Sequence, residues 1–200
     1  MPVFETSVVA LILWAVAGYG LGSIPFGMLL ARVMGLGNLR DIGSGNIGAT
    51  NVLRTGNKTA AALTLLFDAG KGAVIVLLAR QFAGEDAAQI AGLAAIVGHC
   101  FPVWLKFQGG KGVATCFGLL LALAPVVFVV AGAIWLLTAA ISRYSSLAAL
   151  MAAGWAPVAA AFLGAGHVVV LLVVMAVLIY FRHGQNISRL RAGTESKIGK

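Results

Sequence analysis

The chain has 200 residues, of which 60% are hydrophobic and only 10% are charged. Soluble domains have about half apolar and about a quarter charged residues, so this composition excludes a soluble protein and indicates a polytopic membrane protein with one domain, residues 1–200. The formal net charge of +8 does not indicate nucleic-acid binding. The positive charge lies mostly in the connections between apolar runs, where it indicates membrane orientation.

Six apolar runs predict membrane-spanning helices, at residues 6–33, 59–79, 87–105, 113–141, 147–163 and 167–181. The first run contains Pro25, so we expect it to kink or end early, and its Gly18 and Gly22 are spaced for close helix packing. The fourth run would rise about 43 Å as one helix, which exceeds a hydrocarbon core of about 30 Å. We therefore divide it at Pro125 into Val113–Ala124 and Val126–Ile141, which makes seven spans.

The basic residues define the expected topology, because Lys and Arg collect on the cytoplasmic side of a membrane protein. The basic connections are residues 34–58, residues 106–112, the turn at Arg143 and the tail 182–200. All of them lie inside if there are seven spans and the N-terminus is outside. The sequence thus predicts an all-α membrane bundle of seven transmembrane helices with a cytoplasmic C-terminus.

A polar, glycine-rich stretch between the first two spans is the first candidate site. Its glycines permit positive φ, which turns several backbone N–H groups the same way, and such a concave set of donors binds anions. An arginine just beyond it would hold a phosphate with its planar fork. The candidate residues are Gly43, Ser44, Gly45, Asn46, Thr50, Asn51 and Arg54. The alternative is a flexible linker, which would need neither the amide side chains nor the arginine.

The second candidate is the turn that leads into the span beginning at Val113. Glycines beside a lysine at a helix N-terminus form a second anion site, with Gly109, Gly110, Lys111 and Gly112 as its residues. It is not a Walker loop, because Gly112 stands where Ser or Thr should follow the lysine. The alternative is a helix cap with an orientation lysine.

The third candidate is the segment 182–190, where the last span leaves the membrane. On a continuous helix Arg182, Asn186 and Arg189 would share one face, and His183 would share a face with Asn186. The alternative is an interfacial helix whose arginines contact lipid headgroups, and we prefer such a role for Arg191, Lys197 and Lys200. Residues 143–146 would contribute hydroxyl groups, Ser146 among them, on the same side of the membrane.

Other polar residues lie within the apolar runs. Asp68 and Lys71 are spaced to pair with each other, either as a functional site or as scaffold. His99 is expected to cap or hydrogen-bond near the second segment, and Cys100 and Cys116 to be small core residues. The few carboxylates are scattered, so we expect no metal site and no cofactor.

These segments resemble the signature motifs of a known family. Residues 43–54, Gly98 to Pro102 followed by Gly109 to Thr115, Ser146 to Ala148, and Arg182 to Leu190 are similar to the motifs of the bacterial acyl-phosphate:glycerol-3-phosphate acyltransferase family, PlsY. The similarity covers nearly the whole chain, in order and with comparable spacing. Gln108 is a departure, because many relatives are expected to have a basic residue there.

The resemblance implies a seven-helix enzyme of the bacterial cytoplasmic (inner) membrane with its active site facing the cytoplasm. It implies transfer of a fatty acyl group from acyl phosphate to the sn-1 hydroxyl of glycerol 3-phosphate, which yields lysophosphatidic acid and phosphate. Substrates and membrane lipid would be its only partners, with no obligate protein partner. The central residues carried over by the resemblance are Ser44, Arg54, Lys111, Ser146, His183 and Asn186.

The residues themselves are consistent with this chemistry. An acyl phosphate is already activated, so no covalent nucleophile is required, and the sequence offers no Ser or Cys paired with a base. Catalysis would require cations between two anions and an oriented hydroxyl group. The alternative function is a membrane carrier of phosphate or an organic phosphate, which would also use helix N-termini.

Overall fold

The structure, a computed structural model, describes residues 2–199, so Lys200 lies outside the described residues. Within that range every regular element is a helix, with no strand, as predicted. The helices are α1 (Val8–Gly22), α2 (Phe26–Val33), α3 (Ala49–Val52), α4 (Lys58–Ala83), α5 (Glu85–Cys100), α6 (Val113–Leu123), α7 (Pro125–Ser142), α8 (Ser145–Phe162), α9 (Val169–Arg182) and α10 (Gly184–Arg191). Short 3₁₀ turns lie at Leu39–Asp41, Leu53–Thr55, Val103–Leu105 and Gly166–Val168.

Among the described residues, five segments are long and apolar enough to cross a membrane: Val8–Val33, Lys58–Ala83, Glu85–Leu105, Pro125–Ser142 and Ser145–Phe162. The pair Gly166–Arg182 and Gly184–Arg191, bent by 62°, brings the number to six, and α6 is a shorter apolar helix. The chain is therefore a multi-pass membrane protein. The predicted division at Pro125 is confirmed, because α6 ends at Leu123 and Pro125 starts α7, where its missing N–H costs nothing.

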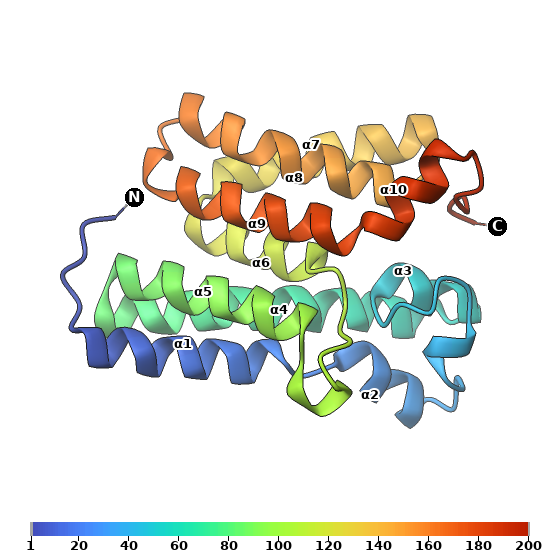
Figure 1. Cartoon of the computed structure of the whole chain (residues 1–200), viewed down its shortest axis with the longest axis horizontal. Helices are drawn as coiled ribbons and strands as arrows, with labels where there is room; N and C mark the ends of the chain where they lie inside the picture. Colours follow the sequence, from blue (N-terminus) through green and yellow to red (C-terminus); the bar gives the residue numbers. More distant parts are fainter. Residues whose placement is uncertain (1, 200) are drawn as a thin grey trace.

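The helices form two groups that lie side by side (Figure 1). One contains α1 to α5 and the other α6 to α10, and α4 joins them by packing on both α5 and α6. The predicted close packing at Gly18 and Gly22 is confirmed: a Cβ on either residue would collide with the backbone of Ala91 or Ala95 on α5. The predicted interruption near Pro25 is also confirmed, because α1 ends at Gly22 and α2 begins at Phe26.

The interruption between α1 and α2 is stabilised by the predicted pair of buried charges. Lys71 Nζ lies 3.0 Å from Asp68 Oδ1 and donates a hydrogen bond of 2.9 Å to the carbonyl oxygen of Ile24. A broken helix leaves backbone carbonyl groups without hydrogen-bond partners, and burying such an unpaired carbonyl group is costly. Lys71 therefore has a scaffold contact, while His99 Nδ1 lies 3.6 Å from the same carboxylate.

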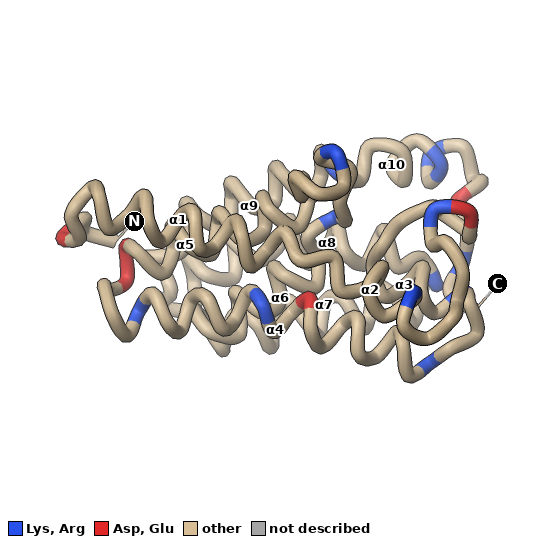
Figure 2. The backbone as a smooth tube through the Cα atoms, turned by 90° about the horizontal axis from the view of Figure 1, so that it is seen from below, with Lys and Arg blue, Asp and Glu red and all other residues tan. Residues whose placement is uncertain are grey.

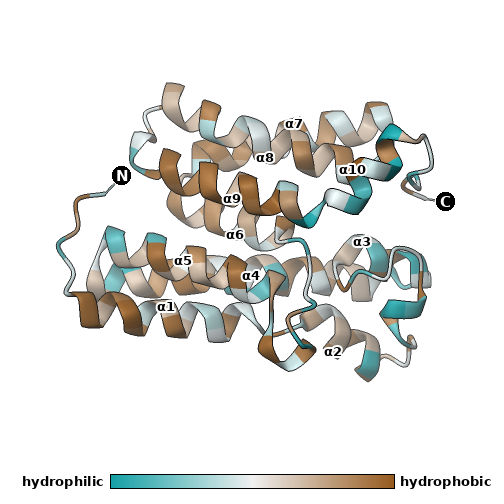
Figure 3. Cartoon of the chain, viewed as in Figure 1, coloured by the Kyte–Doolittle hydropathy of each residue, from teal (hydrophilic) through white to brown (hydrophobic). Residues whose placement is uncertain are grey.

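Polar residues gather at one end of the bundle. Figure 3 shows the hydrophilic segments around α3, α10 and the C-terminal tail, and Figure 2 shows most of the basic residues at that same end. At the opposite end, Arg80 is paired with Glu85 at 2.8 Å, so that end has little net positive charge. The three candidate segments, distant in sequence, thus lie at the same end of the bundle.

Candidate active site

A cavity of about 920 Å³ opens at the polar end and extends between the helices. Its polar lining comes from all three candidate segments, from the start of α8, from the tail and from two residues of α4 and α5: Ser44, Asn46, Thr50, Asn51, Arg54, Lys111, Gly112, Ser145, Ser146, His183, Asn186, Glu195, Ser196 and Lys197, with Asp68 and His99. Its apolar part is lined by α4, α6 and α7. The lining does not include five other residues that we predicted for the site: Gly43, Gly45, Gly109, Gly110 and Arg182.

The first segment is folded around the buried amide of Asn51. Its Oδ1 accepts hydrogen bonds from the Ser44 backbone N–H at 3.0 Å and from the Ser44 hydroxyl at 3.3 Å, and its Nδ2 donates to the carbonyl oxygens of Leu39 and Asn46. Gly43 has a φ of 53°, and a Cβ there would lie 2.6 Å from Arg54 Cδ. The segment is therefore an ordered loop that presents Ser44 and Arg54, rather than a flexible linker.

The second segment is held from two sides. The N–H groups of Gly109 and Gly110 donate to the carbonyl oxygens of Cys100 and His99, at 3.1 and 3.0 Å. Arg182 donates to the carbonyl oxygens of the same two glycines, at 3.1 Å each. The predicted anion site is therefore wrong for Gly109 and Gly110, because their N–H groups are already paired with backbone carbonyl oxygens, whereas Lys111 and Gly112 line the cavity.

The third segment is not one helix, and the predicted shared face of Arg182, Asn186 and Arg189 is wrong. The axis bends by 62° between α9 and α10, with His183 at the bend. Arg182 consequently turns toward the second segment, 5.0 Å from the ring centroid of Phe101. His183 and Asn186 face the cavity.

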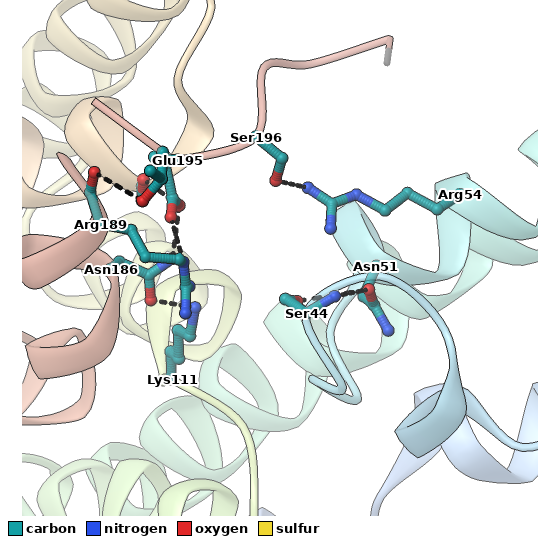
Figure 4. Close-up of polar contacts among 10 residues, drawn as sticks. Ser44, Asn51, Arg54, Lys111, Asn186, Arg189, Glu195 and Ser196 are labelled. Carbon is teal, nitrogen blue, oxygen red and sulfur yellow. Dashed lines mark hydrogen bonds and ion pairs between the residues drawn. The ribbon is translucent and has the colours of Figure 1, made fainter. Parts of the chain in front are cut away.

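The tail completes the site, as Figure 4 shows. The Glu195 carboxylate accepts hydrogen bonds from Ser146 at 2.7 Å, Asn186 at 2.6 Å and Arg189 at 2.6 Å. Lys111 donates to Asn186 Oδ1 on the same side. Across the cavity lie Ser44 and Arg54, and Arg54 donates to the hydroxyl of Ser196.

Sequence reasoning missed the role of this tail. Glu195 is the only carboxylate after Asp86 in the chain, and its position among basic residues was the available signal. Lys197, which we interpreted as a lipid-headgroup contact, instead lines the cavity with its Nζ 5.7 Å from the ring centroid of Tyr144.

Burial and neighbouring charges set the protonation of the site. Burial, together with Arg189, Arg182 and Arg54, lowers the pKa of Lys111 to about 8, although Glu195 opposes this shift. Burial and the nearby Lys111 lower the pKa of His183 to about 4, so its imidazole is neutral at pH 7. Burial alone would raise the pKa of Glu195, but its three hydrogen bonds outweigh burial and lower it.

The tautomer of His183 follows from the hydrogen bond that its imidazole ring makes to the backbone. Its Nδ1 lies 2.8 Å from the carbonyl oxygen of Ile179. A carbonyl oxygen can only accept, so Nδ1 carries the hydrogen and Nε2 is left with a free lone pair. A neutral imidazole of this kind can accept a hydrogen bond from a substrate hydroxyl group.

Comparisons with known proteins agree with this geometry. Residues 12–193 match the family model described as glycerol-3-phosphate acyltransferase. Two proteins named glycerol-3-phosphate acyltransferase, from Roseobacter denitrificans and Ruegeria pomeroyi, are each 62% identical to this chain. The first similarity covers 98% of this chain and the second covers 100% of it, and each covers 98% of the relative.

Two solved structures are similar to the whole fold. The glycerol 3-phosphate form of PlsY (YgiH), an integral membrane glycerol 3-phosphate acyltransferase, has a TM-score of 0.89 and 38% identity, covering 94% of this chain and 96% of that one. The lysophosphatidic acid form of PlsY (YgiH) has a TM-score of 0.86 and 35% identity, covering 94% of this chain and 95% of that one. These relatives are acyltransferases, which supports the enzyme over the carrier. The chain belongs to the glycerol-3-phosphate acyltransferase family.

Proposed function

We propose that this acyltransferase uses acyl phosphate as its donor and binds both phosphorylated substrates in the one cavity. In the reaction, the sn-1 oxygen of glycerol 3-phosphate forms a bond to the acyl carbon. The bond between the acyl carbon and the phosphate oxygen breaks, and the phosphate leaves with the proton of the hydroxyl group. The observation that carries the proposal is the placement of Arg54 and Lys111 on opposite sides of a cavity that continues into an apolar groove.

The two cations would offset the repulsion between the two anionic substrates. Unlike a fully exposed charge, Lys111 is partly buried, so its interaction with a phosphate is screened less by water. Ser44 and the loop built on Asn51 would hold one phosphate, and Ser146 and Asn186 would orient the other substrate. In related chemistry, one donor aimed at a developing oxyanion is worth about 3 kcal/mol.

His183 would orient the acceptor hydroxyl through its free Nε2. A group with a pKa of about 4 is a weak base at pH 7, and general bases work best when their pKa is near the working pH. The final proton acceptor is therefore a phosphate oxygen of the donor, which becomes the inorganic phosphate product.

The membrane arrangement we propose has seven spans, with α6 counted as one and the polar end in the cytoplasm. The N-terminus is then outside and the C-terminus is inside, as the positive charges require. The membrane is the bacterial inner membrane, and no obligate protein partner is needed.

The identity of the acyl donor is tested with purified protein in lipid nanodiscs, which enclose no compartment and so sustain no transmembrane gradient. With hexadecanoyl phosphate and glycerol 3-phosphate, we expect lysophosphatidic acid and inorganic phosphate in equal amounts. Hexadecanoyl coenzyme A should give no product. Transfer from the thioester but not from the acyl phosphate would refute the proposed donor.

A further inference from the structure

The cavity has an apolar extension whose wall contains a glycine. On α7 the lining residues are Phe128, Gly132, Trp135 and Leu136. Relative to Gly132 they stand at i−4, i+3 and i+4, the spacings that share a helix face. Gly132 is therefore at the centre of the face that lines the cavity.

Gly132 also has room for a side chain. A Cβ built there meets no atom within 4 Å. By contrast, Gly118 on α6, which also lines the cavity, would place its Cβ against the backbone of Ala69 on α4. A larger residue at position 132 would therefore fill the cavity without first moving the backbone of a neighbouring helix.

The position of Gly132 along α7 places it beside the distal part of a long chain that lies in the extension. From the polar end inward, α7 contributes Leu136 and Trp135, then Gly132 and finally Phe128. Gly132 lies ten residues before the end of α7 at Ser142, a rise of about 15 Å. Beyond it, the ring of Phe128 packs edge to face against Phe117, with 6.0 Å between centroids.

The cavity is open sideways to lipid, which is how a long chain would enter. α6 packs against both α4 and α7, whereas α4 and α7 make little contact with each other. The residues lining the cavity there include Leu65 and Leu66 of α4, Leu121 of α6 and Leu136 of α7, all exposed. An acyl chain can therefore reach the extension without passing the polar end first.

We infer that Gly132 sets the acyl-chain length that this enzyme accepts, because its missing side chain leaves the extension open to the distal part of a long chain. The inference rests on the proposed function and commits to one occupant, the saturated chain of the acyl donor. A leucine side chain at position 132 would occupy space that the distal methylenes of a long chain otherwise fill, and forcing extra atoms into filled space is unfavourable. Blocking the extension should therefore penalise long chains and leave short chains unaffected.

The experiment measures kcat/KM for a series of acyl phosphates from octanoyl to octadecanoyl in nanodiscs. For Gly132→Leu, we expect the ratio of hexadecanoyl to octanoyl activity to fall about tenfold or more, since the added side chain and the distal part of the long chain would occupy the same space. Gly132→Ala adds only one methyl group and should shift the ratio less in the same direction. That smaller variant also keeps the test decisive if the leucine variant does not fold.

The matched control is Gly20→Leu, on α1 and outside the cavity, where an added Cβ also meets no atom within 4 Å. This variant should leave the ratio of hexadecanoyl to octanoyl activity unchanged. An unchanged ratio in Gly132→Leu, or an equal loss at every chain length, would overturn the inference. If the wild-type protein transfers no acyl group from any acyl phosphate, the proposed donor fails instead, so the two failures are distinguishable.

Discussion

At the scale of single residues, the cavity brings together two cations and a neutral imidazole, because Arg54, Lys111 and His183 all lie in its lining. Such groups are costly in an apolar chain unless a site uses them, which is why the sequence could indicate them. The contacts of Arg182 with Gly109 and Gly110 were not predictable. They depend on a bend in the backbone rather than on residue type.

The low pKa of Lys111 predicts how activity depends on pH. Below a pKa of about 8 the side chain is charged and can neutralise a phosphate, and above it the charge is lost. We therefore expect kcat/KM to fall above about pH 8, in proportion to the protonated fraction. In Lys111→Arg, whatever activity remains should lack this alkaline decline, because arginine stays charged. An identical decline in both proteins would show that another group causes it.

At the scale of elements, proline and glycine positions predicted the breaks between α1 and α2 and between α6 and α7. The break between α9 and α10 had only one local signal, Gly184, and a single glycine does not by itself predict a bend of 62°. The tail was equally hidden, because its order depends on Glu195 meeting three donors from distant segments. Tertiary contacts of this kind are not encoded in local spacing.

The packing of α1 against α5 gives a prediction about stability. In Gly22→Val a Cβ would meet the backbone of Ala95, which cannot yield as a side chain can, and overpacking of this kind costs about 1–3 kcal/mol. We expect a lower thermal midpoint in detergent. Gly20→Val, on the same helix but in open space, should melt close to the wild type. Equal midpoints for the two variants would mean that α1 and α5 pack less closely than described.

At the scale of the whole molecule, composition and loop charge predicted a multi-pass helical protein with its polar segments at one end, and both are confirmed. The number of spans is less directly encoded, because α6 is shorter than an ordinary transmembrane helix. Its place in the membrane depends on the α4 and α7 helices that flank it.

The proposed orientation is tested by labelling intact cells with a membrane-impermeant thiol reagent. The native Cys100 and Cys116 are buried and should not react. Val3→Cys, at an exposed position before α1, should be labelled from outside, whereas Lys58→Cys, exposed at the polar end, should react only after the cells are opened. The reverse pattern would place the active site on the outer face.

We propose that separate loops and the tail form one cavity in which Arg54 and Lys111 act on phosphorylated substrates. The most direct measurement is the steady-state kinetics of Arg54→Ala and Lys111→Ala with acyl phosphate and glycerol 3-phosphate, beside Lys58→Ala, an exposed cation at the same end. We predict a loss of about a hundredfold or more in kcat for each of the first two, at unchanged thermal midpoint, and near wild-type activity for the third. Activities of all three variants within a few-fold of the wild type would contradict the proposed roles of Arg54 and Lys111.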